Sequence, residues 1–579
     1  MDPPPSEINI LTLNCWGLKF ISKLRNERIT EIGRRIAAAD PAPHIVAFQE
    51  LFTQDDYRAV RRETRRTLPY AKFYNSGPFG GGLAILSRWP IEESTMFRYP
   101  LNGRPAAFWR GDWYVGKGVA CAKIRYGPGR RDIIEVFNTH THAPYEESYS
   151  CHRLAQSWEI AKLLRGACDR GHLALGLGDF NMRPGSLHHR IITAHAPVRD
   201  AWRVLHPDSS LGAADDPLER TRRRPIPTAE FNILENGATS DGPYCTWRWT
   251  PKQQKLLGKG EPCVVPPHVI DRKGKRLDYI FLGDGHRHIS SDPDTGSTPA
   301  GGWVVKTAKV GMMDPHPTLG CSVSDHFSVE ATIAFHVPDT TSRSRPLSSV
   351  LMSSHHHQDT DYSSAAAATT TALSTPKDGT FLTGAYLESP TASEHHLPDR
   401  LSLAQTNTHD GRNDNPSSAD SLPTTAAGIN PPQDPKLTRP TPPDLSLQLS
   451  AHPPASADND PLPASTYDEI LLSIHAYTAR ERRQQRQRSF HFFFWLLAWP
   501  AALAGIWFVP RNFIAFILLL IVPPGLVAGV IDGLMALLFF KTELRALREF
   551  EWEVTNAKAV AAGGASHDED DEMGVDKAW

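Results

Sequence analysis

The first 338 residues alternate between short apolar runs and segments in which apolar residues recur at helical spacing. Runs typical of strands cover residues 8–16, 44–51, 81–91, 131–142 and 173–181. Residues 26–39 place Ile29, Ile32 and Ile36 on one helical face, and residues 147–169 form a second amphipathic helix. Interleaved strands and helices predict an α/β or α+β layered fold over residues 6–338, with two sheets or a mixed sheet covered by helices.

A change of composition separates this region from the C-terminal part. Residues 339–464 are rich in Ser, Thr, Pro, Asp and His. Such a segment buries too little apolar surface to offset its chain entropy, which predicts a disordered linker. Two apolar spans follow at 490–509 and 513–540, and each is long enough to cross a bilayer. Because a short loop joins them, they predict a two-helix transmembrane hairpin.

Basic residues flank both ends of the predicted hairpin. Five arginines lie between positions 480 and 488, further basic residues follow the second span, and the loop holds Arg511 alone. The positive-inside rule therefore places both flanks and the N-terminal domain in the cytosol. Residues 465–488 predict a basic amphipathic juxtamembrane helix whose arginines also suit anionic lipids. Residues 541–579 are expected to form an acidic cytosolic tail.

The overall composition argues against several classes of protein. The chain of 579 residues has a formal net charge of −2, which gives no sign of a nucleic-acid-binding protein. Its seven cysteines include no CxxC pair, which argues against a zinc knuckle or a disulfide framework and favours a reducing compartment. The N-terminus has no basic segment followed by a long apolar stretch, so no secretory signal is expected.

Polar side chains stand at the ends of six apolar runs. These positions are Asn14, Glu50, His140, His142, Asp179, Asn181, Asp278, Asp325 and His326. Each ending alone has a structural explanation, because Asp and Asn are common in turns and a strand-end Glu is usually solvated. All six, however, use residue types that hold cations or transfer protons. We interpret them as parts of one catalytic site where the strand ends converge.

The residue types fit metal-assisted hydrolysis of a phosphate ester. Mg²⁺ takes oxygen ligands and needs only one or two carboxylates, which Glu50 assisted by Asn14 would provide. His326, oriented by Asp278, is suited to remove a proton from water. Neutral donors such as Asn181 would stabilise charge on phosphate oxygens. The sequence contains no GxSxG or HExxH motif, so a serine or zinc hydrolase has no support.

The motifs "LNCWGL", "QE", "THTHAPY", "GDFN", "RLDYIF" and "SDHF" resemble, in this order, those of the endonuclease/exonuclease/phosphatase superfamily with the DNase I-like fold. "LTLNCWGLKFISKLRNERITEIG", "GDWYVGKG" and the C-terminal hairpin are more specifically similar to the eukaryotic neutral sphingomyelinases and the fungal inositol phosphosphingolipid phospholipases C. The resemblance covers residues 6–337 and the hairpin. It implies an α+β fold, a DNase I-like two-sheet β-sandwich flanked by helices.

The resemblance also implies roles for the metal and base residues. Glu50 would be the Mg²⁺ ligand, with Asn14 beside it. His326 would be the general base, and Asp278 and Asp325 would support it or lie near the metal.

The resemblance also implies roles for residues that would contact the attacking water or the phosphate. Asp179 would position or activate the attacking water, Asn181 would contact the scissile phosphate, and His142 would hold a phosphate oxygen or assist the leaving group. In the sphingomyelinase family, an Asp and a Lys five residues apart form a switch that positions the site. Asp112 and Lys117 match that spacing.

The predicted function is that of a Mg²⁺-dependent, membrane-anchored phospholipase C-type phosphodiesterase. It would cleave a sphingolipid in the membrane to ceramide and a phosphorylated headgroup, with anionic phospholipids as activators and no nucleic-acid partner. Inositol phosphosphingolipids are favoured over sphingomyelin. The alternatives are a phosphoinositide phosphatase or nuclease of the same fold, or a catalytically inactive membrane scaffold. The endoplasmic reticulum is the expected membrane, with mitochondria as the alternative.

Overall fold

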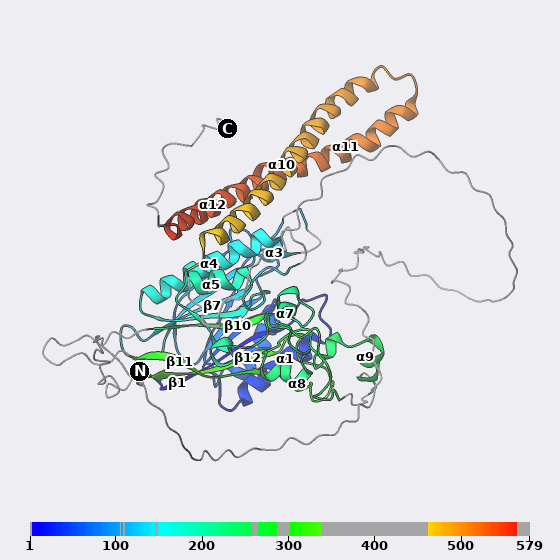
Figure 1. Cartoon of the computed structure of the whole chain (residues 1–579). Coiled ribbons are helices and arrows are strands. Elements are labelled where there is room, and N and C mark those ends of the chain that lie inside the picture. The colour runs from blue at the N-terminus through cyan, green and yellow to red at the C-terminus, as the bar shows by residue number, and fades with distance from the viewer. Residues whose placement is uncertain are drawn as a thin grey trace, which may run out of the picture. The chain divides into compact units, whose positions relative to one another are not determined.

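The computed structural model describes residues 3–104, 106–107, 111–144, 149–257, 259, 264–285, 301–336 and 461–563 (Figure 1). The predicted linker therefore lies outside the described residues except for its last four positions. The end of the predicted acidic tail, from residue 564 onward, also lies outside them.

Two mixed sheets of six strands each form the catalytic domain. The first has the order β11 (Gly302–Gly311), β12 (Ser328–His336), β1 (Glu7–Asn14), β2 (Ile45–Gln49), β4 (Leu83–Ser87), β3 (Tyr70–Tyr74). The second has the order β5 (Ile91–Arg98), β6 (Gly118–Arg125), β7 (Ile133–His140), β8 (Leu173–Asp179), β10 (Asp278–Asp284), β9 (Arg199–Asp200). Each sheet contains one parallel pair, β1 with β2 and β7 with β8. The crossovers are α1 (Arg25–Ala38) and α4 (Ser150–Asp169), as parallel pairs require.

Three apolar clusters separate four layers. The largest lies between the two sheets, where Ile10 and Ile45 of the first sheet meet Val136 and Leu175 of the second. A second cluster packs α1 and α2 (Gln54–Thr64) on the outer face of the first sheet. A third packs α4 and α5 (Leu187–His195) on the second. The predicted two-sheet sandwich flanked by helices is therefore confirmed.

Several short helices occupy the connections between these layers. They are α3 (Asp112–Val115), α6 (Ala201–Leu205), α7 (Pro217–Thr221), α8 (Ala229–Leu234), η3 (Thr246–Arg248) and α9 (Pro251–Leu257). The six cysteines among the described residues are all free thiols.

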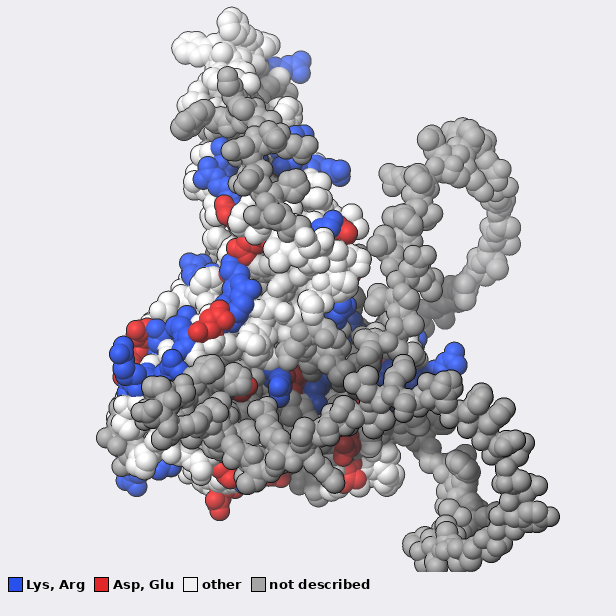
Figure 2. All heavy atoms as spheres, turned by 60° about the vertical axis from the view of Figure 1, so that its left-hand side comes forward, with Lys and Arg blue, Asp and Glu red and all other residues white. Residues whose placement is uncertain are grey.

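The C-terminal part consists of α10 (Ala464–Ile506), α11 (Asn512–Leu534), the π-helical turn η6 (Met535–Phe540) and α12 (Lys541–Ala561). Two of its helices are long and apolar enough to cross a membrane, which agrees with the predicted hairpin. The predicted juxtamembrane helix and first span are one continuous helix, because no Gly or Pro interrupts the chain between Ala464 and Trp499. Figure 2 shows mostly uncharged surface along the outer part of this helical pair and Lys and Arg side chains gathered below it.

The lower parts of α10 and α12 pack directly on the catalytic domain. Trp158 of α4 and Ile191 of α5 share one apolar cluster with Ile474 of α10 and Phe550 of α12. Trp158 Nε1 also donates a hydrogen bond of 2.5 Å to Glu553. The hairpin is thus joined to the helix layer that covers the second sheet.

Candidate active site

The inter-sheet core ends in a layer of polar side chains at one end of the sandwich. Because strand residues two apart share a face, the core-facing rows of β1, β7 and β8 continue from apolar residues to Asn14, His140 and Asp179. The strand register aligns these ends, since His140 lies opposite Asp179 and Asp179 lies opposite Asp278 of β10. Strand pairing therefore brings together His140, Asp179 and Asp278, and the packing of the two sheets adds Asn14, which is 165 positions from Asp179 in sequence.

Glu50 lies directly after β2, where the backbone turns into the left-handed region with φ of 55°. Asn14 Nδ2 donates to Glu50 Oε1 at 3.1 Å and to Asp179 Oδ2 at 3.0 Å, so this amide bridges the two carboxylates. Burial raises the pKa of Glu50 to about 7, and the nearby charge of Asp325 adds to the effect.

His326 and Asp278 form a buried pair. His326 Nδ1 lies 2.9 Å from Asp278 Oδ2, which also accepts a hydrogen bond of 2.6 Å from Thr239 Oγ1. Burial by itself would lower the pKa of His326, but the charges of Asp278, Asp179 and Asp325 outweigh it and raise the pKa well above its usual value. The Nδ1 contact leaves Nε2 directed toward Asp179, whose Oδ2 is 3.9 Å away.

Asp179 is the common neighbour of these groups. Its Oδ1 accepts the backbone N–H of Asn181 at 2.9 Å, and its Oδ2 lies 3.6 Å from His140 Nε2. Burial, with a contribution from Asp278, raises the pKa of Asp179 to about 6, although His326 opposes the increase. Asn181 has φ of 46°, so the chain turns sharply directly after the strand and its side chain bonds to the carbonyl of Thr141 at 3.2 Å.

His142 lies beside this group on the segment after β7. Its backbone N–H donates to Gln156 Oε1 at 2.8 Å, and its Nδ1 lies 2.8 Å from the carbonyl oxygen of Ala143. Burial, together with the charges of His152 and Lys117, lowers the pKa of His142 well below its usual value. His142 is therefore a neutral imidazole whose Nδ1 proton is held by the backbone.

Asp112, the first residue of α3, and Lys117, two residues after the end of α3, both reach this site. Lys117 Nζ lies 3.8 Å from Asp112 Oδ1 and donates to the carbonyl of Thr141 at 3.0 Å. Asp112 Oδ2 is 3.4 Å from His142 Nε2. The two residues predicted to form a switch are thus adjacent and buried against the residues predicted to contact phosphate.

The structure brings all the predicted site residues to one end of the sandwich. Sequence reasoning missed the residues that support them, notably Thr239 behind Asp278, Gln156 behind His142, and Ser324, whose hydroxyl donates to the carbonyl of Asn14 at 2.5 Å. These residues lie in a loop, in the middle of a helix and in a turn. Ser324 begins the motif "SDHF", but no motif marks Thr239 or Gln156 in the sequence.

The donor set fits a hard divalent cation. Asp179, Asp278 and His326 each offer a ligand atom, and these atoms lie within 4.8 Å of one another. Among the described residues, Glu50 Oε2 and Asp325 Oδ1 are buried without a hydrogen-bond partner. Buried carboxylate oxygens that lack a donor are the ligands that such an ion prefers.

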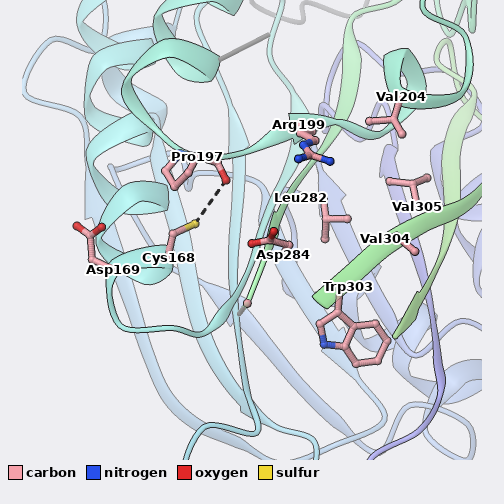
Figure 3. A pocket seen from close by; sticks show the side chains of 11 residues that line it. Cys168, Asp169, Pro197, Arg199, Val204, Leu282, Asp284, Trp303, Val304 and Val305 are labelled. Atoms are coloured by element: carbon pink, nitrogen blue, oxygen red, sulfur yellow. Dashed lines mark hydrogen bonds between the residues drawn. The ribbon is translucent and has the colours of Figure 1, made fainter. Parts of the chain in front are cut away.

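A separate pocket lies at the opposite end of β10 (Figure 3). Asp278 begins this strand at the candidate active site, whereas Leu282 and Asp284 near its other end line the pocket together with Cys168 and Trp303. The Cys168 thiol points toward the carbonyl of Pro197 at 4.0 Å, and burial raises its pKa to about 12. This pocket therefore offers no reactive thiolate at neutral pH and none of the convergent groups found at the other end.

The fold and the clustered polar strand ends define a two-sheet sandwich protein with a possible metal site formed by Asp179, Asp278 and His326. Residues 11–326 match the model of the endonuclease/exonuclease/phosphatase family, and the chain belongs to this family. It is 40% identical over 331 residues to "Inositol phosphosphingolipids phospholipase C" of Schizosaccharomyces pombe, which covers 57% of this chain and 68% of that protein.

Two further relatives agree with this assignment. The protein of the same name from Saccharomyces cerevisiae is 33% identical over 369 residues, covering 59% of this chain and 67% of that protein. "Sphingomyelin phosphodiesterase 2" of Rattus norvegicus is 30% identical over 200 residues, covering 34% of this chain and 46% of that protein. The predicted superfamily is confirmed. The relatives are phosphodiesterases, as predicted for this chain.

Proposed function

We propose that this protein is a Mg²⁺-dependent, membrane-anchored phospholipase C that cleaves inositol phosphosphingolipids to ceramide and a phosphorylated headgroup. The observation that carries the proposal is the buried His326–Asp278 pair, which faces the acidic group of Asp179 and Glu50 in a chain that ends in an apolar hairpin. The names of the fungal relatives support the substrate class.

Water is the nucleophile in this reaction. His326 Nε2 takes a proton from the water, while Asp278 holds the opposite ring nitrogen and stabilises the imidazolium that forms. Asp179, 3.9 Å from Nε2, accepts a hydrogen bond from the water and orients it. The water oxygen bonds to phosphorus, and the bond between phosphorus and the ceramide oxygen breaks. The ceramide oxygen takes up a proton from solvent, and His326 returns its proton to solvent.

Mg²⁺ would be held by Glu50, with Asn14 and Asp325 beside it. When bound, the ion polarises the phosphate oxygens and offsets the carboxylate charge that otherwise keeps His326 protonated. The amide of Asn181 and the ammonium group of Lys117 donate toward the non-bridging oxygens, where negative charge develops. Asp112 holds Lys117 in place from a distance of 3.8 Å.

The anchor serves a lipid substrate, because tethering raises the effective concentration of the enzyme at the bilayer. The arginines between positions 480 and 488 would place the catalytic domain in the cytosol and attract anionic phospholipids, which we propose as activators. The endoplasmic reticulum is the proposed membrane.

The test measures headgroup release by the full chain in mixed micelles that contain an anionic phospholipid. Inositol phosphoceramide and sphingomyelin are offered in parallel, with Mg²⁺ or EDTA. We expect Mg²⁺-dependent release of phosphoinositol that Glu50→Ala and His326→Ala abolish while both variants stay folded and membrane-inserted. Release of neither headgroup by folded protein would overturn the proposal and favour a phosphoinositide phosphatase, a nuclease or an inactive scaffold.

A further inference from the structure

A fully buried arginine bonds to backbone carbonyls of two segments that carry residues of the proposed metal site. Arg28 is the fourth residue of α1. Its guanidinium group donates to four carbonyl oxygens, those of Lys23 at 2.9 Å, Cys15 at 3.1 Å, Trp16 at 2.8 Å and Val323 at 2.7 Å. A buried cation is costly unless its donors are satisfied, so this side chain favours the arrangement in which all four carbonyls are in place.

The first of these segments directly follows Asn14 at the end of β1. Trp16 has φ of 47°, so the chain makes a left-handed turn there, and its backbone N–H donates to Asn14 Oδ1 at 3.0 Å. This bond leaves Asn14 Nδ2 to bridge Glu50 and Asp179. Arg28 holds the turn, because its guanidinium group bonds to the Trp16 carbonyl and lies 4.7 Å from the centre of the Trp16 ring. The direction of the Asn14 amide is therefore set by a turn that Arg28 holds.

The second segment lies before β12 and carries Asp325. The carbonyl of Val323, which Arg28 bonds, is two residues before Asp325 and 295 positions from Arg28 in sequence. Between them, the hydroxyl of Ser324 donates to the carbonyl of Asn14 at 2.5 Å. Two polar contacts, one from Arg28 and one from Ser324, thus join the segment before β12 to the segment after β1.

We propose that Arg28 is a positioning residue for the metal site, which holds the segment after β1 against the segment before β12 so that Asn14 and Asp325 lie beside Glu50. Arg28 acts through these residues, because its donors are occupied by backbone carbonyls. The planar guanidinium group can donate to carbonyls on several sides, whereas the single nitrogen of a lysine cannot reproduce this pattern. The inference rests on the proposed function, because it concerns the residues assigned there to Mg²⁺.

The experiment measures the binding of Mn²⁺ alone to the full chain in detergent micelles, without substrate. Binding is followed by the loss of the free-ion electron paramagnetic resonance signal, with Mg²⁺ as competitor. Arg28→Lys keeps the positive charge and removes the planar group. Groups that orient metal ligands typically contribute about 10- to 100-fold to metal affinity, so we expect this variant to raise the dissociation constant about tenfold. The Mg²⁺ concentration that half-saturates headgroup release should rise by the same factor.

Arg35→Lys is the matched control. Arg35 lies in the same helix, and its guanidinium group also donates to backbone carbonyls, those of Asp314 at 2.5 Å and Pro315 at 2.7 Å. We expect this variant to bind Mn²⁺ like the unaltered chain, and equal losses in both variants would overturn the proposal. Ser324→Ala removes the other contact between the two segments and should also weaken Mn²⁺ binding. If Arg28→Lys does not fold, unchanged binding by Ser324→Ala overturns the proposal.

The two proposals fail in different ways. If the unaltered chain binds Mn²⁺ and releases no headgroup, the proposed function is wrong, while Mn²⁺ binding still decides the role of Arg28. If the unaltered chain is active and Arg28→Lys binds Mn²⁺ equally tightly, the positioning role is wrong and the proposed function stands. Absence of Mn²⁺ and Mg²⁺ binding by the unaltered chain would overturn both.

Discussion

Replacing Asp278 by asparagine tests whether the His326–Asp278 pair removes the proton from water. Asp278 Oδ2 accepts from His326 Nδ1 at 2.9 Å and from Thr239 Oγ1 at 2.6 Å. The amide keeps the volume of the side chain but removes its charge, and its NH₂ group can donate to Nδ1. The imidazole proton then moves to Nε2, the atom that must accept a proton from water.

The expected loss of rate follows from the hydrogen bond. A hydrogen bond to a charged group contributes about 1.5–3 kcal/mol, and each 1.36 kcal/mol corresponds to a factor of ten in rate. Asp278→Asn should therefore lower kcat about 10- to 150-fold. Asp278 also contributes to the raised pKa of His326, so the acidic limb of the kcat/KM profile should move to lower pH in the variant.

The assay is the rate of headgroup release as a function of Mg²⁺ concentration. Thr239→Val is the matched control, because it removes the other hydrogen bond to the same oxygen and leaves the charge, so its loss should be smaller. Asp278 is also close enough to Asp179 and His326 to be a metal ligand. If Asp278→Asn raises the half-saturating Mg²⁺ concentration and leaves the maximal rate unchanged, Asp278 is a metal ligand. Either that result or a maximal rate within about threefold of the unaltered chain would refute the role of Asp278 in orienting His326.

Three further predictions concern the metal ligand, the backbone beside it and the base of the hairpin. Since the pKa of Glu50 is raised to about 7 and the cation binds the carboxylate, the proton competes below pH 7. The half-saturating Mg²⁺ concentration should then rise about tenfold per pH unit, and equal values at pH 6 and 8 would contradict this. Gly17→Ala would place a Cβ 2.1 Å from the Glu50 carbonyl oxygen, so we expect loss of activity and a lower melting temperature by calorimetry. Tyr477→Phe removes a 2.7 Å hydrogen bond to Glu543 and should weaken the docking of α10 by about 1–2 kcal/mol, seen as faster amide exchange in its lower turns.

The strand-end pattern predicted much of the site because one regular feature, the alternation of faces along a strand, carries it. The period of two in β8 leads from Leu175 and Leu177 to Asp179, and the sequence shows that period directly. The contact between His326 and Asp278 depends instead on how β10 and the segment before β12 come together, which no local pattern encodes. The positive φ of Glu50 is equally hidden, since glutamate has no preference for that conformation.

The missed parts of the site share a physical cause. Arg153 and Gln156 lie in the amphipathic helix that the sequence predicted, but apolar periodicity does not show which polar residues of a helix bond to the site. Helix α10 shows an error of the opposite kind, because the sequence predicted a boundary that the structure lacks. The change from a polar to an apolar segment near residue 489 predicted a boundary between the juxtamembrane helix and the first span. Such a change alters which solvent the side chains prefer, but it does not alter the backbone conformation.

Helix α4 connects the membrane hairpin with the proposed phosphate site through neighbouring residues of its first turn. His152 Nε2 lies 3.1 Å from Glu543 at the start of α12, while the next residue, Arg153, bonds to the carbonyl of Asn181. One turn further, Gln156 holds the backbone of His142. These contacts come from the first two turns of one helix. Helix α4 therefore contacts both the base of the hairpin and the backbone of the proposed phosphate site, an arrangement that suits the lipid substrate proposed for this chain.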